Sequence, residues 1–202
     1  MPRTLVIQAG GDSKRMGQDK ALLPFCGKPL IERIIERLSG LAGEVCITSN
    51  QTLSAKLKYL GLPVFADIIP CKGALGGLYT ALASTANPEV IVVGSDMPFV
   101  NASLLAAQCD LLATTRSDAV IPISSYGFEP LHAVYRRESC LAALKAALDA
   151  GEMRLSSWFS KVLVYKMTFE EAAVYDPELR SFINVNTPVE FQSAETLART
   201  MG

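Results

Sequence analysis

The stretch VIVVGSD, residues 90–96, decides the fold of this chain. Its first four residues are apolar and β-branched without alternation, which is typical of a strand that is buried on both faces. The strand then passes directly into glycine, serine and Asp96. Strands of this kind belong to parallel sheets covered by helices, and ligands bind such sheets beyond the carboxyl ends of the strands. We therefore expect the chemistry of this chain at its strand exits.

Short apolar runs recur on both sides of this stretch and alternate with helical patterns. The predicted strands are residues 5–9, 45–48, 64–66, 120–123, 131–135 and 162–165, and the predicted helices are 30–38, 53–60, 75–82, 101–112 and 141–148. Residues 182–186 (FINVN) are predicted to form a strand or its exit. Residues 187–190 (TPVE) are a capping box before a last helix that ends near residue 198. This alternation predicts an α/β fold: one domain over residues 1–202, with three layers, α/β/α, around a mostly parallel sheet.

Composition excludes several classes of function. The chain has 202 residues, 50% hydrophobic and 19% charged, with a net charge of −1. Without a basic excess or a run of like charges, no nucleic-acid partner is expected. No apolar stretch is long enough to span a membrane, and the first residues do not resemble a signal peptide. The five cysteines are scattered without a CxxC pair, which argues against disulfides or zinc and predicts a cytoplasmic location.

The exit of the first strand, QAGGDSKRMGQDK at residues 8–20, is rich in glycines and cations. Glycines let backbone N–H groups approach an anion closely, and Lys14, Arg15 and Lys20 can offset the charge of a polyphosphate. The stretch contains neither the GxxxxGK[ST] nor the GxGxxG motif. A tight, solvated turn with surface lysines would have the same composition, so the spacing leaves both interpretations open.

Asp96 follows the central strand within three residues, in GSDMPF at residues 94–99. A carboxylate at that point is placed at the ligand crevice, and Mg²⁺ is typically held by few carboxylates together with phosphate oxygens. The alternative is an aspartate that caps the turn before the helix beginning at Asn101.

Three weaker signals lie at other strand ends. Asp67 follows the third strand and precedes the glycines of KGALGG, residues 72–77, which permit close packing or close approach of a ligand. Asn184 and Asn186 would share one face if their segment is a strand, although turn chemistry explains them equally well. The single histidine, His132, has no His or Cys neighbour for a metal site, and a core or substrate-adjacent role is favoured over a general base.

Together these motifs resemble the molybdenum cofactor guanylyltransferases, the MobA family of nucleotidyltransferases. The resemblance is carried by AGGDSKRMGQDKALL (9–23), GKPL (27–30), GALGGL (73–78), SDMPF (95–99), PLHAVY (130–135) and FINVNTP (182–188). It covers nearly the whole chain in order. The family often has Leu at the position of Gln8 and Pro at the position of Ala74.

The resemblance implies a nucleotide-diphospho-sugar transferase type of fold, with a nucleotide half over about 1–100 and an acceptor half over about 101–202. It implies transfer of GMP from Mg²⁺-GTP to the phosphate of molybdopterin, with release of pyrophosphate. Receiving molybdoenzymes or other cofactor-biosynthesis proteins are further expected partners. The alternatives are a transferase that uses CTP or another phosphate acceptor, a glycosyltransferase, and a non-catalytic GTP-binding carrier.

Roles for individual residues follow from the matched positions. The nucleotide would be bound by Gln8, Ala9, Gly10, Lys20, Asp67 and Asp96. Lys20 would bind phosphate and Asp96 would also bind Mg²⁺. We add Arg15 as a phosphate clamp from its place in the loop, and Asn184 and Asn186 as acceptor-binding residues. Because the acceptor phosphate is already an anion, the main difficulty is to bring two anions into line, and cations can overcome it without a covalent intermediate.

Overall fold

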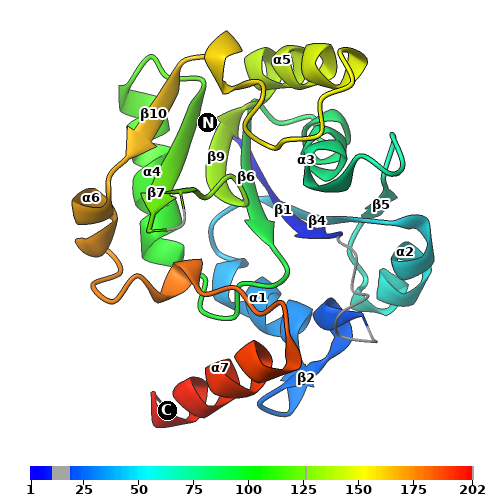
Figure 1. The fold of residues 1–202 in the computed structure, drawn as a ribbon, viewed down its shortest axis with the longest axis vertical. Coiled ribbons are helices and arrows are strands. Elements are labelled where there is room, and N and C mark those ends of the chain that lie inside the picture. Colours follow the sequence, from blue (N-terminus) through cyan, green and yellow to red (C-terminus); the bar gives the residue numbers. More distant parts are fainter. Residues whose placement is uncertain (11–18, 126, 202) are drawn as a thin grey trace.

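The computed structural model of the chain describes residues 1–10, 19–125 and 127–201. In that part, eight strands form one sheet in the order β10-β7-β9-β6-β1-β4-β5, with β8 paired to β7 (Figure 1). The strands are β1 (Arg3–Ala9), β4 (Glu44–Ser49), β5 (Val64–Ala66), β6 (Glu89–Gly94), β7 (Ala119–Ser124), β8 (Gly127–Phe128), β9 (His132–Arg136) and β10 (Val164–Met167). A separate antiparallel hairpin joins β2 (Pro24–Phe25) and β3 (Lys28–Pro29).

The central strand β6 is buried along its whole length, as its apolar sequence predicts. It pairs in parallel with β1 on one side and antiparallel with β9 on the other. The pairs β1–β4, β4–β5 and β7–β10 are also parallel, and β9 is antiparallel to β7 as well. The predicted mostly parallel sheet is therefore confirmed, with β9 as a reversed strand in its middle.

Helices cover both faces of this sheet and complete three layers (Figure 1). The helices are α1 (Leu30–Leu38), α2 (Gln51–Leu57), α3 (Gly73–Ala83), α4 (Ala102–Thr114), α5 (Arg137–Asp149), α6 (Phe169–Ala173) and α7 (Pro188–Thr200). Alternate residues of the strands separate the core into two clusters. Ile91 and Val93 of β6 pack with α1, α2, α4, α6 and α7, whereas Val90 and Val92 pack with α3 and α5. The period of two along a strand produces this division.

One predicted strand is wrong. Residues 182–186 form no ladder: Arg180–Phe182 is a 3₁₀ turn, η5, and the chain then runs irregularly to α7. Phe182 and Val185 of this segment are both buried, a spacing of three instead of two. The predicted capping box is confirmed, because the Thr187 hydroxyl accepts from Glu190 N and the Glu190 side chain accepts from the backbone at the cap. The β2–β3 hairpin, β8 and α6 were not predicted.

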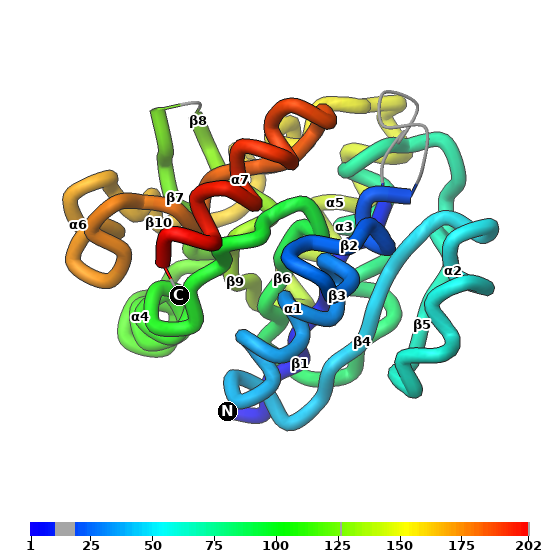
Figure 2. The backbone as a smooth tube through the Cα atoms, turned by 90° about the horizontal axis from the view of Figure 1, so that it is seen from below, coloured from blue at the N-terminus to red at the C-terminus, as the bar shows by residue number. Residues whose placement is uncertain are grey.

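Helix α7 returns to the beginning of the chain and lies beside the β2–β3 hairpin (Figures 1 and 2). The ring of Phe191 packs edge-on against Phe25, with centroids 5.5 Å apart. Cys26 N donates a 2.6 Å hydrogen bond to Glu195 Oε1. The last helix and the segment after the first strand are therefore one packed unit.

Polar side chains at the amino-terminal end of the sheet pair with one another. Arg3 Nε donates to Glu89 Oε2 at 2.8 Å, and Thr4 Oγ1 donates to Glu44 Oε2 at 2.6 Å. Asn87 Nδ2 donates to both Thr4 Oγ1 and Glu44 Oε2. These contacts join β1, β4 and β6 where the strands begin, opposite the end at which the sequence predicts the chemistry.

Candidate functional site

The exits of β1 and β6 lie side by side at the carboxyl end of the sheet. Gln8 is the register partner of Gly94, and Ser95 N donates a 3.0 Å hydrogen bond to Gln8 O. The parallel pairing thus continues one residue beyond β6. It brings the start of the glycine-rich segment next to the SDMPF motif, although the two are more than 80 positions apart in sequence.

Asp96 projects from this junction and is partly exposed, at 25% of its side chain. Its Oδ2 atom lies 3.2 Å from Lys20 Nζ, and its backbone oxygen accepts a 2.9 Å hydrogen bond from Val185 N. Its Oδ1 atom lies over Gly94, where a Cβ atom would come within 2.6 Å. Glycine at position 94 therefore leaves the room that this carboxylate needs.

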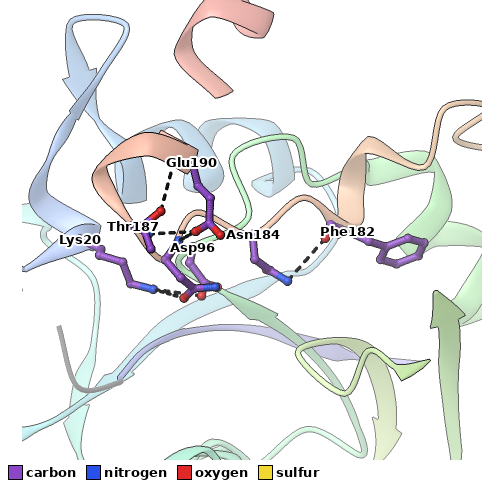
Figure 3. Close-up of polar contacts among 7 residues, drawn as sticks. Lys20, Asp96, Phe182, Asn184, Thr187 and Glu190 are labelled. Carbon is purple, nitrogen blue, oxygen red and sulfur yellow. Dashed lines mark hydrogen bonds and ion pairs between the residues drawn. The ribbon is translucent and has the colours of Figure 1, made fainter. Parts of the chain in front are cut away.

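Lys20 connects three distant parts of the chain at this point. It begins the 3₁₀ turn η2 (Lys20–Leu22), and its Nζ atom also donates a 2.8 Å hydrogen bond to Asn186 Oδ1 (Figure 3). Its side chain is only 16% exposed. An ammonium group held between a carboxylate and an amide oxygen, and still partly exposed, is positioned to bind an anion.

Asn186 is held in place by the cap of α7. Its backbone N donates to Glu190 Oε2 at 2.7 Å, as does Thr187 N at 2.9 Å (Figure 3). These backbone hydrogen bonds lower the pKa of Glu190, so the carboxylate that fixes the cap stays ionised. The capping box that begins α7 therefore also sets the position of Asn186 beside Lys20.

Asn184 does not join this cluster. Its Nδ2 atom lies 3.5 Å from the carbonyl oxygen of Phe182 and points toward that residue (Figure 3). The expectation that Asn184 and Asn186 share a strand face is wrong, because their segment is not a strand. Both residues nevertheless line one groove.

The groove lies between α7 and the end of β7 and has a volume of about 740 Å³. Asn186, which accepts the hydrogen bond from Lys20, is part of its lining. Apolar side chains, among them Phe182, Ile183 and Val189, form much of its wall. Polar groups at its edge come from Ser124, Ser125, Asn184, Asn186 and Glu190. A flat, partly apolar molecule with polar substituents fits this lining.

Gln8 is buried between β1 and α3. Its Nε2 atom donates to Ala74 O at 3.3 Å, and its Oε1 atom is buried with no partner among the residues that the structure describes. A Cβ atom at position 77 would lie 2.3 Å from Nε2, so Gly77 is required for this packing. Within the described part of the chain, this acceptor near the strand exit is left without a hydrogen-bond donor.

The remaining predicted residues are placed as follows. Ala9 is buried at the end of β1, and Gly10 follows it in an exposed position. Asp67 follows β5, donates from its backbone N to Ser49 O, and has a pKa raised by burial. Arg15 lies outside the described residues.

Glu129 is an acidic residue that the sequence did not single out. The register of β6 and β9 ends at Val93 with His132, Gly94 N bonds to Leu131 O just beyond it, and the charge of Asp96 acts on Glu129 from across this end of the sheet. Glu129 is buried and accepts a 2.5 Å hydrogen bond from Ser124 Oγ. Burial, and to a lesser degree the charge of Asp96, raise its pKa. The closeness of Glu129 to Asp96 becomes visible only when β6 is paired with β9, because no local motif in the sequence indicates it.

His132 is fully buried in β9. Burial lowers its pKa to about 4, so the ring is neutral near pH 7. It is therefore a core residue, away from the exposed crevice, and it does not act there as a general base.

The sequence can now be compared with known proteins. Residues 5–164 match the MobA-like NTP transferase domain. This chain belongs to the MobA-like NTP transferase family. It is therefore a nucleotidyltransferase, as its motifs predict, and the crevice beside Lys20 and Asp96 is the candidate active site of this MobA-like enzyme.

Curated relatives match nearly the whole MobA-like chain. A probable molybdenum cofactor guanylyltransferase from Natranaerobius thermophilus is 33% identical over 94% of this chain and 93% of the relative. One from Natronomonas pharaonis is 35% identical over 95% of this chain and 96% of the relative. The solved molybdopterin-guanine dinucleotide biosynthesis protein A from Archaeoglobus fulgidus superposes with a TM-score of 0.87 at 27% identity. The superposition covers 98% of this chain and 100% of that structure.

More distant structures share the fold alone. The 4-diphosphocytidyl-2C-methyl-D-erythritol synthase from Anaerococcus prevotii superposes with a TM-score of 0.73 at 11% identity. This likeness confirms the predicted nucleotide-diphospho-sugar transferase type of architecture. Across the described part of this MobA-like chain, none of the helices is both long and apolar enough to cross a membrane.

Proposed function

We propose that this MobA-like transferase moves GMP from Mg²⁺-bound GTP to the phosphate of molybdopterin and releases pyrophosphate. The observation that carries the proposal is the cluster of Lys20, Asp96 and Asn186, which joins both halves of the chain at the carboxyl end of the sheet. Support also comes from the relatives named molybdenum cofactor guanylyltransferase, which match this chain over nearly its full length.

The nucleotide is assigned to residues 1–100 and the acceptor to the rest. Gln8, Ala9, Gly10 and Asp67 follow strand exits on the β1–β4–β5 side of the sheet, where the glycine-rich segment begins. The groove lined by Asn184 and Asn186 is formed by residues of the second half of the chain, and Asn186 connects it to Lys20. Its partly apolar wall suits the flat ring system of a pterin, and its amides suit the polar edge of that ring.

The residues at the crevice fit a single Mg²⁺ ion. The described residues contain no cluster of three or more His, Cys, Asp or Glu side chains suited to a metal. Mg²⁺ is typically bound by one or two carboxylates and completes its shell with water and phosphate, so Asp96 alone is a sufficient protein ligand. The ion would supply charge neutralisation at the phosphates of GTP.

The transfer follows from these positions. An oxygen of the acceptor phosphate attacks the α-phosphorus of GTP in line, a new P–O bond forms, and the bond to the departing pyrophosphate breaks. Lys20 donates to phosphate oxygens and offsets the repulsion between the two anions. Because the attacking oxygen already carries charge, no general base is needed, which agrees with the burial of His132.

Pyrophosphate release from each of the four nucleoside triphosphates, with and without molybdenum-loaded pterin, tests the proposal. We expect release with GTP only when the pterin is present. Release with CTP instead would assign cytidylyl transfer, and GTP binding without release would assign a carrier. Equal pyrophosphate release without any pterin would overturn the assignment of molybdopterin as the acceptor.

A further inference from the structure

We propose that His132 is a positioning residue for the acceptor, which acts by holding Phe182 and the segment 182–186 behind the groove. This inference rests on the proposed function in assigning the groove to the acceptor. The placement of the segment itself can be measured without any acceptor.

The ring of His132 packs against the ring of Phe182. Their centroids are 5.3 Å apart and their planes meet at 72°, an edge-to-face arrangement. Phe182 lines the groove, and its carbonyl oxygen lies 3.5 Å from Asn184 Nδ2. His132 is therefore the layer immediately behind the groove wall.

Two contacts join the segment 182–186 to the sheet. One is the contact of Phe182 with His132 of β9, and the other is the hydrogen bond from Val185 N to Asp96 O, just after β6. These two strands are neighbours, because His132 is the register partner of Val93, three residues before Asp96. The β6–β9 pair thus supports the acceptor segment and the candidate metal ligand together, without regular secondary structure in the segment itself.

Buried polar groups lie beside the His132 ring and beside the turn that carries Phe182. Gln108 Nε2, from α4, donates to His132 O at 3.1 Å and lies 3.5 Å from His132 Nδ1. Asp176 Oδ2 accepts from Ser181 N at 2.8 Å, and the charge of Asp176 partly opposes the lowering of the His132 pKa by burial. Directional polar contacts in a core favour one arrangement over others.

The polar groups around His132 destabilise the core in a way that apolar packing would not. His132 Nε2, Gln108 Oε1 and Ser181 Oγ are buried without a hydrogen-bond partner among the described residues. An apolar side chain at position 132 would avoid leaving a buried polar atom unpaired. The cost falls directly beneath the segment that bears Asn184 and Asn186, which is where a fixed geometry would serve the reaction.

Hydrogen exchange and steady-state kinetics of the full chain test the inference. We compare His132→Ala, which removes the ring, His132→Phe, which keeps a ring against Phe182, and the control Tyr135→Phe. Tyr135 lies on the same strand, is equally buried and faces the opposite core cluster. The change to Phe removes the 2.5 Å hydrogen bond that the Tyr135 hydroxyl donates to Pro130 O.

We expect faster amide exchange at residues 181–186 in His132→Ala, with Val185 as the most direct probe, and near-normal exchange in His132→Phe and Tyr135→Phe. The acceptor KM should rise roughly tenfold in His132→Ala, while the GTP KM and kcat stay within about twofold. His132→Phe should restore the acceptor KM.

Two outcomes overturn the inference: unchanged exchange at 181–186 in His132→Ala, or an acceptor KM that rises equally in Tyr135→Phe. If His132→Ala fails to fold, Phe182→Leu supplies the same loss of ring contact from the other side. Failure of the proposed function is distinct, because wild-type protein would then release no pyrophosphate with the pterin while the exchange result would stand.

Discussion

Glu89 and Asp96 stand at the two ends of the same buried strand, and each pairs with a cation near β1. Arg3 Nε lies 2.8 Å from Glu89 Oε2, and Lys20 Nζ lies 3.2 Å from Asp96 Oδ2. The Glu89 side chain is 1% exposed and its neighbours pair with one another, whereas the Asp96 side chain is 25% exposed and its partner Lys20 also contacts Asn186 in the lining of the groove. The first pair completes the fold, and the second is left accessible to a ligand.

The comparison teaches that residue type alone does not separate structural from functional charges. Both pairs are one acid and one base, on the adjacent strands β1 and β6 for Arg3 and Glu89, and on the turn η2 and the exit of β6 for Lys20 and Asp96. The difference lies in what surrounds them: at the amino end, the network of Thr4, Glu44 and Asn87, and at the carboxyl end, amides and a cap supplied by the last part of the chain. Substitutions at the two ends should therefore separate loss of activity from loss of stability.

The largest expected effect is that of Asp96→Asn. It keeps the shape and removes the charge, so turnover should fall by about 10²- to 10³-fold, while the melting temperature stays nearly unchanged because Lys20 keeps Asn186 as a partner. The measurement is a Mg²⁺ titration of turnover with GTP bound. An unchanged Mg²⁺ dependence would show that Asp96 only caps the turn before the next helix, and that it is a structural residue as Glu89 is.

Lys20→Ala should reduce GTP turnover by about 10- to 100-fold, the loss of a charged hydrogen bond worth about 1.5–3 kcal/mol. The matched control is Lys56→Ala, which removes another lysine of the same end, one that pairs with Asp19 at 2.6 Å and is 53% exposed. Steady-state kinetics of both variants make the comparison. Wild-type turnover by Lys20→Ala would contradict the assignment.

At the other end, Glu89→Gln should cost about 1–3 kcal/mol of unfolding free energy, because it weakens the buried contact with Arg3. Turnover per folded molecule should not change. Urea denaturation, together with kinetics at a temperature well below the transition, checks both expectations. A loss of turnover without loss of stability would show that the two ends are not separate in function.

Asn186→Ala should raise the acceptor KM by about 3- to 10-fold, the value of a neutral hydrogen bond. GTP affinity should stay nearly unchanged, since Lys20 retains Asp96. Asn184→Ala, at the same groove but outside the Lys20 cluster, is the companion variant. An equal loss of GTP affinity in Asn186→Ala would move Asn186 to the nucleotide side.

The smallest expected effect is an increase in stability, and it concerns Glu129. Burial raises the pKa of Glu129 from its ordinary 4.5, so its ionised form destabilises the folded state. Stability from such a group is lost as pH rises through the raised pKa. Glu129→Gln should therefore increase the melting temperature near pH 7, and the gain should shrink as pH falls toward 4.5. A decrease at pH 7 would show that Glu129 stabilises the carboxyl end as Glu89 stabilises the amino end.

Much of the fold was predictable because buried strands and helix caps have recognisable residue patterns in the sequence. The run from Val90 to Val93 predicts a central strand, and the hydroxyl of Thr187 with Glu190 three residues later predicts a cap; both are confirmed. The direction of β9 was not predictable, since parallel and antiparallel strands buried on both faces have the same composition. The segment 182–186 misled because apolar and polar residues alternate over 183–186, yet the chain after the 3₁₀ turn is irregular and its buried side chains, Phe182 and Val185, are three positions apart.

The candidate site was predictable residue by residue but not as an arrangement. The motifs singled out Lys20, Asp96 and Asn186, yet no spacing in the sequence indicates that one ammonium group contacts both of the others. Glu129 was missed because its closeness to Asp96 depends on the pairing of β6 with β9. Long-range pairing is the information that a local motif does not contain.

The hydrogen bond between Lys20 and Asn186 spans 166 positions of the chain. At the usual pace of synthesis, about 5–20 residues per second, roughly 8 to 33 seconds separate the appearance of the two residues on the ribosome. Throughout that interval the first strands can pair, but the lysine has no amide to meet. The contact between Lys20 and Asn186 thus forms late in the life of the nascent protein, and a ribosome that stalls before residue 186 leaves a chain in which Lys20 lacks this partner.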